Sequence, residues 1–119
     1  MKKSNDYSEL SKSLTKNINK TDKKKYGIFF TPPETIIKNM EFLKPYMKDI
    51  KTILEPSCGS CEYISTLKNI NNDIDITGVE LNETIYESIK HLEEDNITLL
   101  NDNYLTHDFN SKFDLVIGN

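Results

Sequence analysis

The chain has 119 residues, enough for one small domain, with a net charge of −4, 36% hydrophobic residues and 29% charged residues. Without a long apolar run or a signal-peptide pattern, it is unlike a membrane-embedded chain, and we expect a soluble, intracellular protein with no membrane partner. Two cysteines do not indicate a secreted disulfide scaffold.

Lysines are concentrated at the start of the chain. Residues 1–25 contain eight lysines against three acids, so the remaining residues are acidic. Such an arm could approach a phosphate backbone, but a solvated leader explains the same composition. We expect a basic, partly disordered leader over 1–25, with a weak helical pattern at Leu10, Leu14 and Ile18, and a folded domain over 26–119.

Strands and helices alternate in the second half of the sequence. After "TPPE", apolar residues at Ile36, Met40, Leu43 and Met47 predict one face of a helix, which prolines suit at its first turn. The predicted strands then span 51–55, 75–81, 96–101 and 113–118, and the helices between them span 61–70 and 82–94. This order predicts an α/β fold with a parallel sheet of about four strands behind an N-terminal helical segment.

Polar residues stand where the predicted strands end. In parallel sheets, ligands bind at these carboxyl ends, close to the point where strand order reverses. The four ends carry Glu55-Pro56, Glu80, Asn101-Asp102 and Gly118-Asn119. Each acid alone could cap a helix or lie in a solvated turn, but together they predict a ligand site, because buried strand ends do not need carboxylates for packing.

The first strand leads into "CGSC", which allows three interpretations. A redox pair of the thioredoxin type would be accompanied by a downstream cis-proline, and no proline follows Pro56. A zinc site needs about four ligands, and His91 and His107 have no matching spacing. We therefore expect Cys58 and Cys61 to be small, buried side chains in a tight turn and predict no metal site.

The third interpretation is a cofactor loop. Gly59 would allow close approach of the backbone to a ligand, and the next helix would point its N-terminus at the same space. Glu80, about 20 residues further on, could accept both ribose hydroxyls, and Asp102 could accept from an exocyclic amine. These positions suit a nucleoside-containing cofactor. The loop lacks the other glycines of G-x-G-x-x-G, and no phosphate-binding loop of the G-x-x-x-x-G-K type occurs.

Five motifs in order resemble those of S-adenosylmethionine-dependent adenine-N6 DNA methyltransferases of the restriction-modification type. They are "YGIFFTPPE", "EPSCGSCEY", "GVELN", "NDNYL" and "FDLVIGN", and they cover about residues 25–119. The resemblance implies a partial Rossmann-like methyltransferase fold with S-adenosylmethionine as cofactor. It assigns cofactor-binding roles to Thr31, Pro32, Glu55, Pro56, Gly59, Glu80, Asp102 and Asn103.

The resemblance also implies a catalytic residue and a substrate. The side-chain carbonyl of Asn119 would accept a hydrogen bond from the amino group of the target adenine, which must first leave the base stack of double-stranded DNA. The sequence departs from the family pattern at Cys61, where a second glycine is usual, and we expect weaker cofactor binding there. Pro-Pro-aromatic does not follow Asn119, so we expect an N-terminal part that is inactive alone and has no recognition domain.

Several alternatives stay open at this stage. A methyltransferase with the same catalytic motif could act on a protein glutamine or on RNA. The chain could instead be a non-catalytic remnant that binds the cofactor, and a second chain could complete the fold.

Overall fold

The computed structural model describes residues 8–17 and 30–118, and within them the sheet has four parallel strands. They are β1 (Thr52–Glu55), β2 (Asp75–Glu80), β3 (Ile97–Asn101) and β4 (Leu115–Val116). Their order in the sheet is β3-β2-β1-β4. The chain therefore steps outward from β1 to β3 and then returns to the other side of β1, which confirms the predicted parallel α/β sheet and puts the reversal of strand order beside β1.

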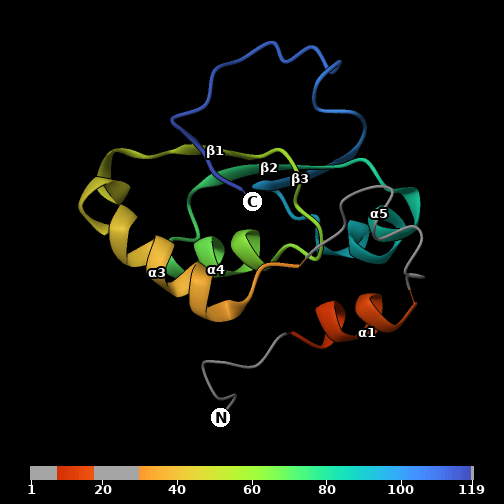
Figure 1. Cartoon of the computed structure of the whole chain (residues 1–119). Helices are drawn as coiled ribbons and strands as arrows, with labels where there is room; N and C mark the ends of the chain where they lie inside the picture. Colours follow the sequence, from red (N-terminus) through yellow and green to blue (C-terminus); the bar gives the residue numbers. More distant parts are fainter. Residues whose placement is uncertain (1–7, 18–29, 119) are drawn as a thin grey trace.

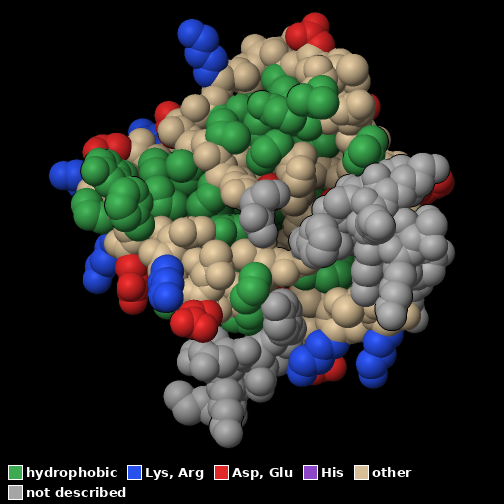
Figure 2. Space-filling model, viewed as in Figure 1, with side chains coloured by type: hydrophobic (Ala, Val, Ile, Leu, Met, Phe, Trp, Pro, Cys, Tyr) green, Lys and Arg blue, Asp and Glu red, His purple; other side chains and the backbone are tan. Residues whose placement is uncertain are grey.

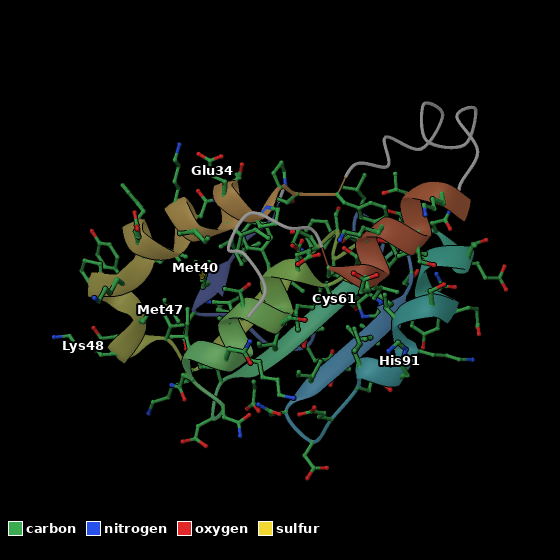
Figure 3. The ribbon with its side chains drawn as sticks, turned by 90° about the horizontal axis from the view of Figure 1, so that it is seen from below. Glu34, Met40, Met47, Lys48, Cys61 and His91 are labelled. Carbon is green, nitrogen blue, oxygen red and sulfur yellow. The ribbon has the colours of Figure 1, made fainter. Side chains whose placement is uncertain are left out.

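The described helices lie on one side of this sheet (Figure 1). They are α1 (Glu9–Asn17), α3 (Pro33–Leu43), α4 (Glu62–Ile70) and α5 (Glu83–Ile89), with short 3-10 turns η1 (Lys44–Asp49) and η2 (Lys90–Leu92). The apolar face predicted after "TPPE" is confirmed, because Ile36 and Met40 are buried. From the helix side, Met40 and Met47 lie between α3 with η1 and the neighbouring α4 (Figure 3).

The core forms where these helices meet the sheet. Ile53, Ile76 and Ile97 pair across β1, β2 and β3, so their side chains point to the same face. All three are almost fully buried, together with Ile64 and Leu67 of α4. This packing anchors the strand ends, and the loops that leave them inherit fixed positions.

The other face of the sheet is covered differently. Leu54 and Val79 point to that face and are buried, and the segment from β3 to β4 arches over it (Figure 1). Within this segment the rings of His107 and Phe109 are 4.4 Å apart. Hydrophobic side chains also gather on the surface around the end of α3 and η1 (Figure 2), where Phe42 is 78% exposed.

Two predicted elements are shorter than expected. The strand predicted over 113–118 pairs only at Leu115 and Val116. At its start the Asp114 carboxylate accepts from the amides of Lys51 and Thr52, and after its end Ile117 N still donates to Leu54 O at 3.0 Å. The helix predicted over 82–94 ends earlier, since the residues after η2 contact β3: the Glu93 carboxylate accepts from Leu99 N and Glu94 bridges Ile97.

The start of the chain is described only in part. The helical pattern at Leu10 and Leu14 is confirmed by α1, where Leu14 is 3% exposed, whereas Ile18 lies outside the described residues. The boundary between a leader over 1–25 and a domain over 26–119 stays a prediction. No helix in the described ranges is long and apolar enough to cross a membrane.

Candidate functional site

The loop after β1 makes a tight turn with two residues of left-handed backbone. Gly59 has φ +52° and Cys61 has φ +63°. The turn is closed by Cys61 N, which donates to Cys58 O at 2.8 Å, and is tied to the sheet by Cys58 N, which donates to Val79 O at 2.9 Å. A left-handed conformation is unfavourable for an L residue, so surrounding contacts must hold Cys61 in place.

Glu80, at the end of β2, supplies one of these contacts. Its Oε2 accepts from Gly59 N at 2.9 Å and its Oε1 accepts from Asn82 N at 3.1 Å. Asn82 in turn caps α5 by accepting from Ile85 N through its side chain. Burial raises the pKa of Glu80, and the two backbone amides partly offset this rise. One carboxylate thus fixes both the cofactor loop and the entry to α5.

Glu55, at the end of β1, is even more enclosed. It is 2% exposed, and its Oε1 accepts from Ser57 N at 2.9 Å. Burial raises the pKa of Glu55 to about 7, the Ser57 amide opposes this, and the charge of Glu80 adds to it. A Cβ at Gly118, two residues after β4, would lie 2.5 Å from Glu55 Oε1, so a side chain there would require the Glu55 carboxylate to shift.

A small polar cavity joins the segment before α3 to the loop after β1. Its lining residues are Phe30, Thr31, Glu55, Ser57, Cys58, Gly59, Ser60, Glu62 and Tyr63. A Cβ on Gly59 would lie 3.5 Å from the Phe30 ring, which shows how closely the two segments meet. The cavity volume is about 20 Å³, room for roughly one water, so the cavity itself is too small for a nucleoside-containing cofactor.

The structure therefore brings together most of the predicted site residues. Thr31, Glu55 and Gly59 line one cavity, and Glu80 bonds directly to Gly59. Pro32 precedes α3 beside Thr31, and Pro56 lies next to Gly118. Asn119 lies outside the described residues.

Asp102, after β3, has a different setting. It is exposed, with Oδ1 accepting from Asn103 N at 2.7 Å and Oδ2 lying 2.7 Å from His107 Nδ1. These hydrogen bonds, that to His107 first, lower the pKa of Asp102. The Asn101 side chain ties this strand end to β2 by donating to Glu80 O at 2.9 Å. The sequence does not predict the contact between His107 and Asp102, because nothing in the spacing of these two residues distinguishes His107 from a surface histidine.

The two cysteines do not suit redox chemistry. Cys58 and Cys61 are buried and do not form a disulfide with each other. A hydrogen bond with Cys61, together with burial, raises the pKa of the Cys58 thiol, so the reactive thiolate is disfavoured. Among the described residues, no group of three or more His, Cys, Asp and Glu side chains could hold a metal ion.

Comparison with known proteins settles the family. The family model described as N-6 DNA Methylase matches residues 5–119. The chain belongs to the N-6 DNA methylase family. The match includes the loop after β1 and the acids at the strand ends.

Curated relatives of this chain are named as methyltransferases. The Type II methyltransferase M.CvrRI of Paramecium bursaria Chlorella virus XZ-6E is 30% identical over 95% of this chain and 29% of its own length. The modification methylase CviBIII of Paramecium bursaria Chlorella virus NC1A is 34% identical over 95% of this chain and 30% of its own length. The chain thus spans less than a third of the length of each of these two relatives.

Solved structures share the fold of this N-6 DNA methylase chain. CalS10, an amino pentose methyltransferase from Micromonospora echinaspora with bound SAM, has a TM-score of 0.60 and 16% identity, covering 96% of this chain and 43% of that one. StiE O-MT has a TM-score of 0.61 and 14% identity, covering 92% of this chain and 40% of that one. These likenesses confirm the Rossmann-like methyltransferase fold.

Proposed function

We propose that this chain is the cofactor-binding part of a site-specific DNA methyltransferase that transfers a methyl group from S-adenosylmethionine to N6 of adenine. The observation that carries the proposal is the double contact of Glu80, which holds the amides of Gly59 and Asn82 at adjacent strand ends. A carboxylate offers about four acceptor positions. Glu80 therefore keeps acceptor capacity for the two hydroxyls of a ribose placed above the loop.

The remaining cofactor residues fit the same ligand. Thr31 and Pro32 adjoin the loop where the methionine end would lie, and Glu55, Pro56 and Gly59 shape the surface beneath it. Asp102 lies at the next strand end, where an adenine amine would find a charged acceptor, with the backbone of Asn103 beside it. When bound, S-adenosylmethionine supplies an activated methyl group on a sulfonium.

Asn119 is the proposed catalytic residue. Gly118 lies against Glu55 and Pro56, so the chain reaches the cofactor loop one residue before Asn119. The Asn119 carbonyl would accept from the target amine and orient its nitrogen toward the methyl carbon, which contributes chiefly by positioning. The match to the family model described as N-6 DNA Methylase supports DNA as the substrate.

The proposed partner is double-stranded DNA inside the cell, recognised through residues other than those described here. A second chain that completes the fold is compatible with the same site. The alternative substrates, a protein glutamine or RNA, would use the same cofactor residues, so cofactor binding does not separate them from DNA.

Two measurements test the proposal. Isothermal titration of the chain should show binding of S-adenosylmethionine and S-adenosylhomocysteine, and none of NAD⁺ or ATP. Expression of this chain within a reading frame of the length of its relatives, in a host that lacks adenine methylation, should produce N6-methyladenine in DNA, detected by nucleoside mass spectrometry. Unmodified DNA with methylated RNA or methylglutamine would favour the alternative substrates, and binding without any transfer would favour a non-catalytic role.

A further inference from the structure

We propose that Ser11 of α1 is a positioning residue for the cofactor loop, although it lies outside the cofactor cavity. The inference rests on the proposed function and deepens it. Ser11 is 49 residues before Ser60, yet their hydroxyl oxygens lie 2.5 Å apart in the buried interior. Ser60 and Glu62 line the cavity, whereas no residue of α1 does. Ser11 would therefore act on the cofactor only through these two side chains.

The Ser11 hydroxyl has one consistent hydrogen-bond arrangement. It donates to Glu62 Oε1 at 2.7 Å, and the Ser8 hydroxyl donates to it at 3.1 Å. A hydroxyl has one proton to donate and two lone pairs with which to accept. With its own proton given to Glu62, Ser11 must accept from Ser60. The Ser60 proton is thereby committed to Ser11, and the orientation of the Ser60 side chain is fixed.

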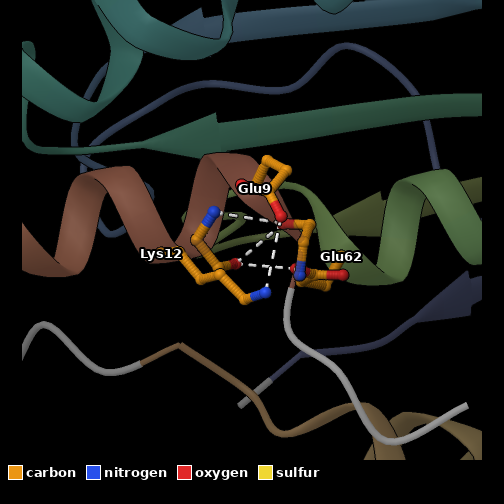
Figure 4. A network of polar contacts seen from close by, with 5 residues as sticks. Glu9, Lys12 and Glu62 are labelled. Atoms are coloured by element: carbon orange, nitrogen blue, oxygen red, sulfur yellow. Dashed lines mark hydrogen bonds and ion pairs between the residues drawn. The ribbon is translucent and has the colours of Figure 1, made fainter. Parts of the chain in front are cut away.

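Glu62 accepts a second hydrogen bond from the residue that precedes α1. Its Oε1 also accepts from Ser8 N at 3.1 Å, immediately before α1 begins (Figure 4). The Ser8 hydroxyl accepts from Ser11 N at 3.1 Å, which closes the network at the start of the helix. A carboxylate at a helix N-terminus also interacts favourably with the helix dipole. The start of α1 and the start of α4 are therefore joined through one carboxylate.

Apolar contacts hold α1 against the same region. Leu14 packs with Ile85 of α5, and Leu10 and Phe30 border this small cluster. Phe30 is the residue whose ring lies against Gly59. The loop is thus braced from two directions, since Glu80 binds Gly59 from the sheet and Ser11 binds the next residue, Ser60, from α1.

The contacts of Ser11 are expected to affect the affinity of the loop for the cofactor. The loop has left-handed backbone at Gly59 and Cys61, on either side of Ser60, and such backbone persists only when contacts hold it. Loss of the Ser11 hydroxyl would leave the buried Ser60 hydroxyl without its acceptor. Part of the binding free energy would then be used to order the loop. The affinity for the cofactor should therefore fall although no cofactor contact is removed.

The test compares serine-to-alanine variants in the whole 119-residue chain. Ser11→Ala and Ser60→Ala should each weaken S-adenosylmethionine binding roughly tenfold. The double variant should be no weaker than either single one, because both remove the same bond. Ser88→Ala is the matched control, since the Ser88 hydroxyl donates to a carbonyl of its own helix, and its affinity should stay within about twofold of wild type.

A second variant pair guards against a general loss of folding. Glu62→Gln keeps an oxygen that accepts from Ser8 N and Ser11 and should retain most of the affinity, whereas Glu62→Ala should behave like Ser11→Ala. Amide hydrogen exchange without cofactor gives an independent readout. The amides of residues 59–61 should exchange roughly tenfold faster in Ser11→Ala and at the wild-type rate in Ser88→Ala.

The outcomes separate the two proposals. If Ser11→Ala lowers the melting temperature but leaves affinity and loop exchange at wild-type values, Ser11 only secures α1 and the inference is overturned. If the wild-type chain does not bind S-adenosylmethionine, the proposed function fails, and the exchange rates alone still decide whether Ser11 orders the loop.

Discussion

The acids at the ends of β2 and β3 are neighbours in the sheet but differ in environment. Glu80 is 8% exposed and accepts from the amide of Gly59 in the loop after β1 as well as from Asn82 N in its own turn. Asp102 is exposed and bonds only within its own loop, to Asn103 N and His107. The inner acid shapes the site, whereas the outer acid is presented to solvent.

The pKa values of these acids also differ with their environment. Burial raises the pKa of Glu80, as it does that of Glu55, while hydrogen bonds lower the pKa of Asp102. The charge of Glu55 is therefore sensitive to mild acid, whereas the lowered pKa of Asp102 favours its ionised form. Position at a strand end alone does not determine what an acid does there; its burial and its hydrogen-bond donors do.

The largest expected effect concerns Glu55. Its folded-state pKa of about 7 lies above the ordinary 4.5, so its contribution to stability is complete below pH 4.5 and is lost as pH rises to 7. At 1.36 kcal/mol per pH unit the loss is roughly 3 kcal/mol. In urea titrations, Glu55→Gln should therefore gain stability over wild type progressively between pH 4.5 and 7. Parallel curves for the two proteins would show that Glu55 is not a buried, hard-to-ionise acid.

Removal of the inner acid at β2 comes next. Glu80→Ala leaves Gly59 N and Asn82 N without their acceptor, and relief of burying a carboxylate offsets part of that cost. We expect a net loss of about 2 kcal/mol in the free energy of unfolding and no measurable S-adenosylmethionine binding. Glu87→Ala, at an exposed site on α5, is the control. Retained binding in Glu80→Ala would remove the central support for the proposed ribose contact.

A smaller change in stability is expected at Cys61, which lies between Glu55 and Glu80 in the sequence. Cys61→Gly relieves left-handed backbone worth about 1–2 kcal/mol but loses a fully buried side chain, so the net change in stability should be under about 1 kcal/mol. Cys61 does not line the cavity, so cofactor affinity should stay within about twofold. Tighter binding by the glycine variant would show instead that the thiol crowds the cofactor.

The outer acid should give the smallest change in stability. Asp102→Asn should leave the urea midpoint unchanged, since the site is exposed. Calorimetric affinity for S-adenosylmethionine should nevertheless fall several-fold, because the adenine amine loses a charged acceptor. Asp108→Asn, in the same exposed segment, should change neither quantity. An unchanged affinity in Asp102→Asn would assign the adenine contact elsewhere.

Local patterns in the sequence predict the framework well. Apolar spacing places Ile36 and Met40 on one buried face, and alternation of strands and helices gives the parallel sheet. The acids Glu55 and Glu80 were found because ends of parallel strands meet at one edge. These features depend on residues close in sequence or on a general rule of the fold.

Contacts between distant segments could not be predicted in this way. Ser11 and Glu62 are 51 residues apart, and a serine on a polar helix has no periodic signature. The close approach of Gly118 to Glu55 likewise appears only once β4 lies beside β1. The contact of the Asp114 carboxylate with the amides of Lys51 and Thr52 also joins residues more than 60 positions apart.

Because the turn buries both cysteines, their rate of labelling can report how often the turn opens. The chain has two cysteines, Cys58 and Cys61, and neither is more than 6% exposed. A thiol-specific reagent could modify them only while the turn stands open, so the labelling rate relative to a free thiol gives the fraction of time spent open. A cysteine added elsewhere on the surface would accept a dye alone, without any need to remove the native pair.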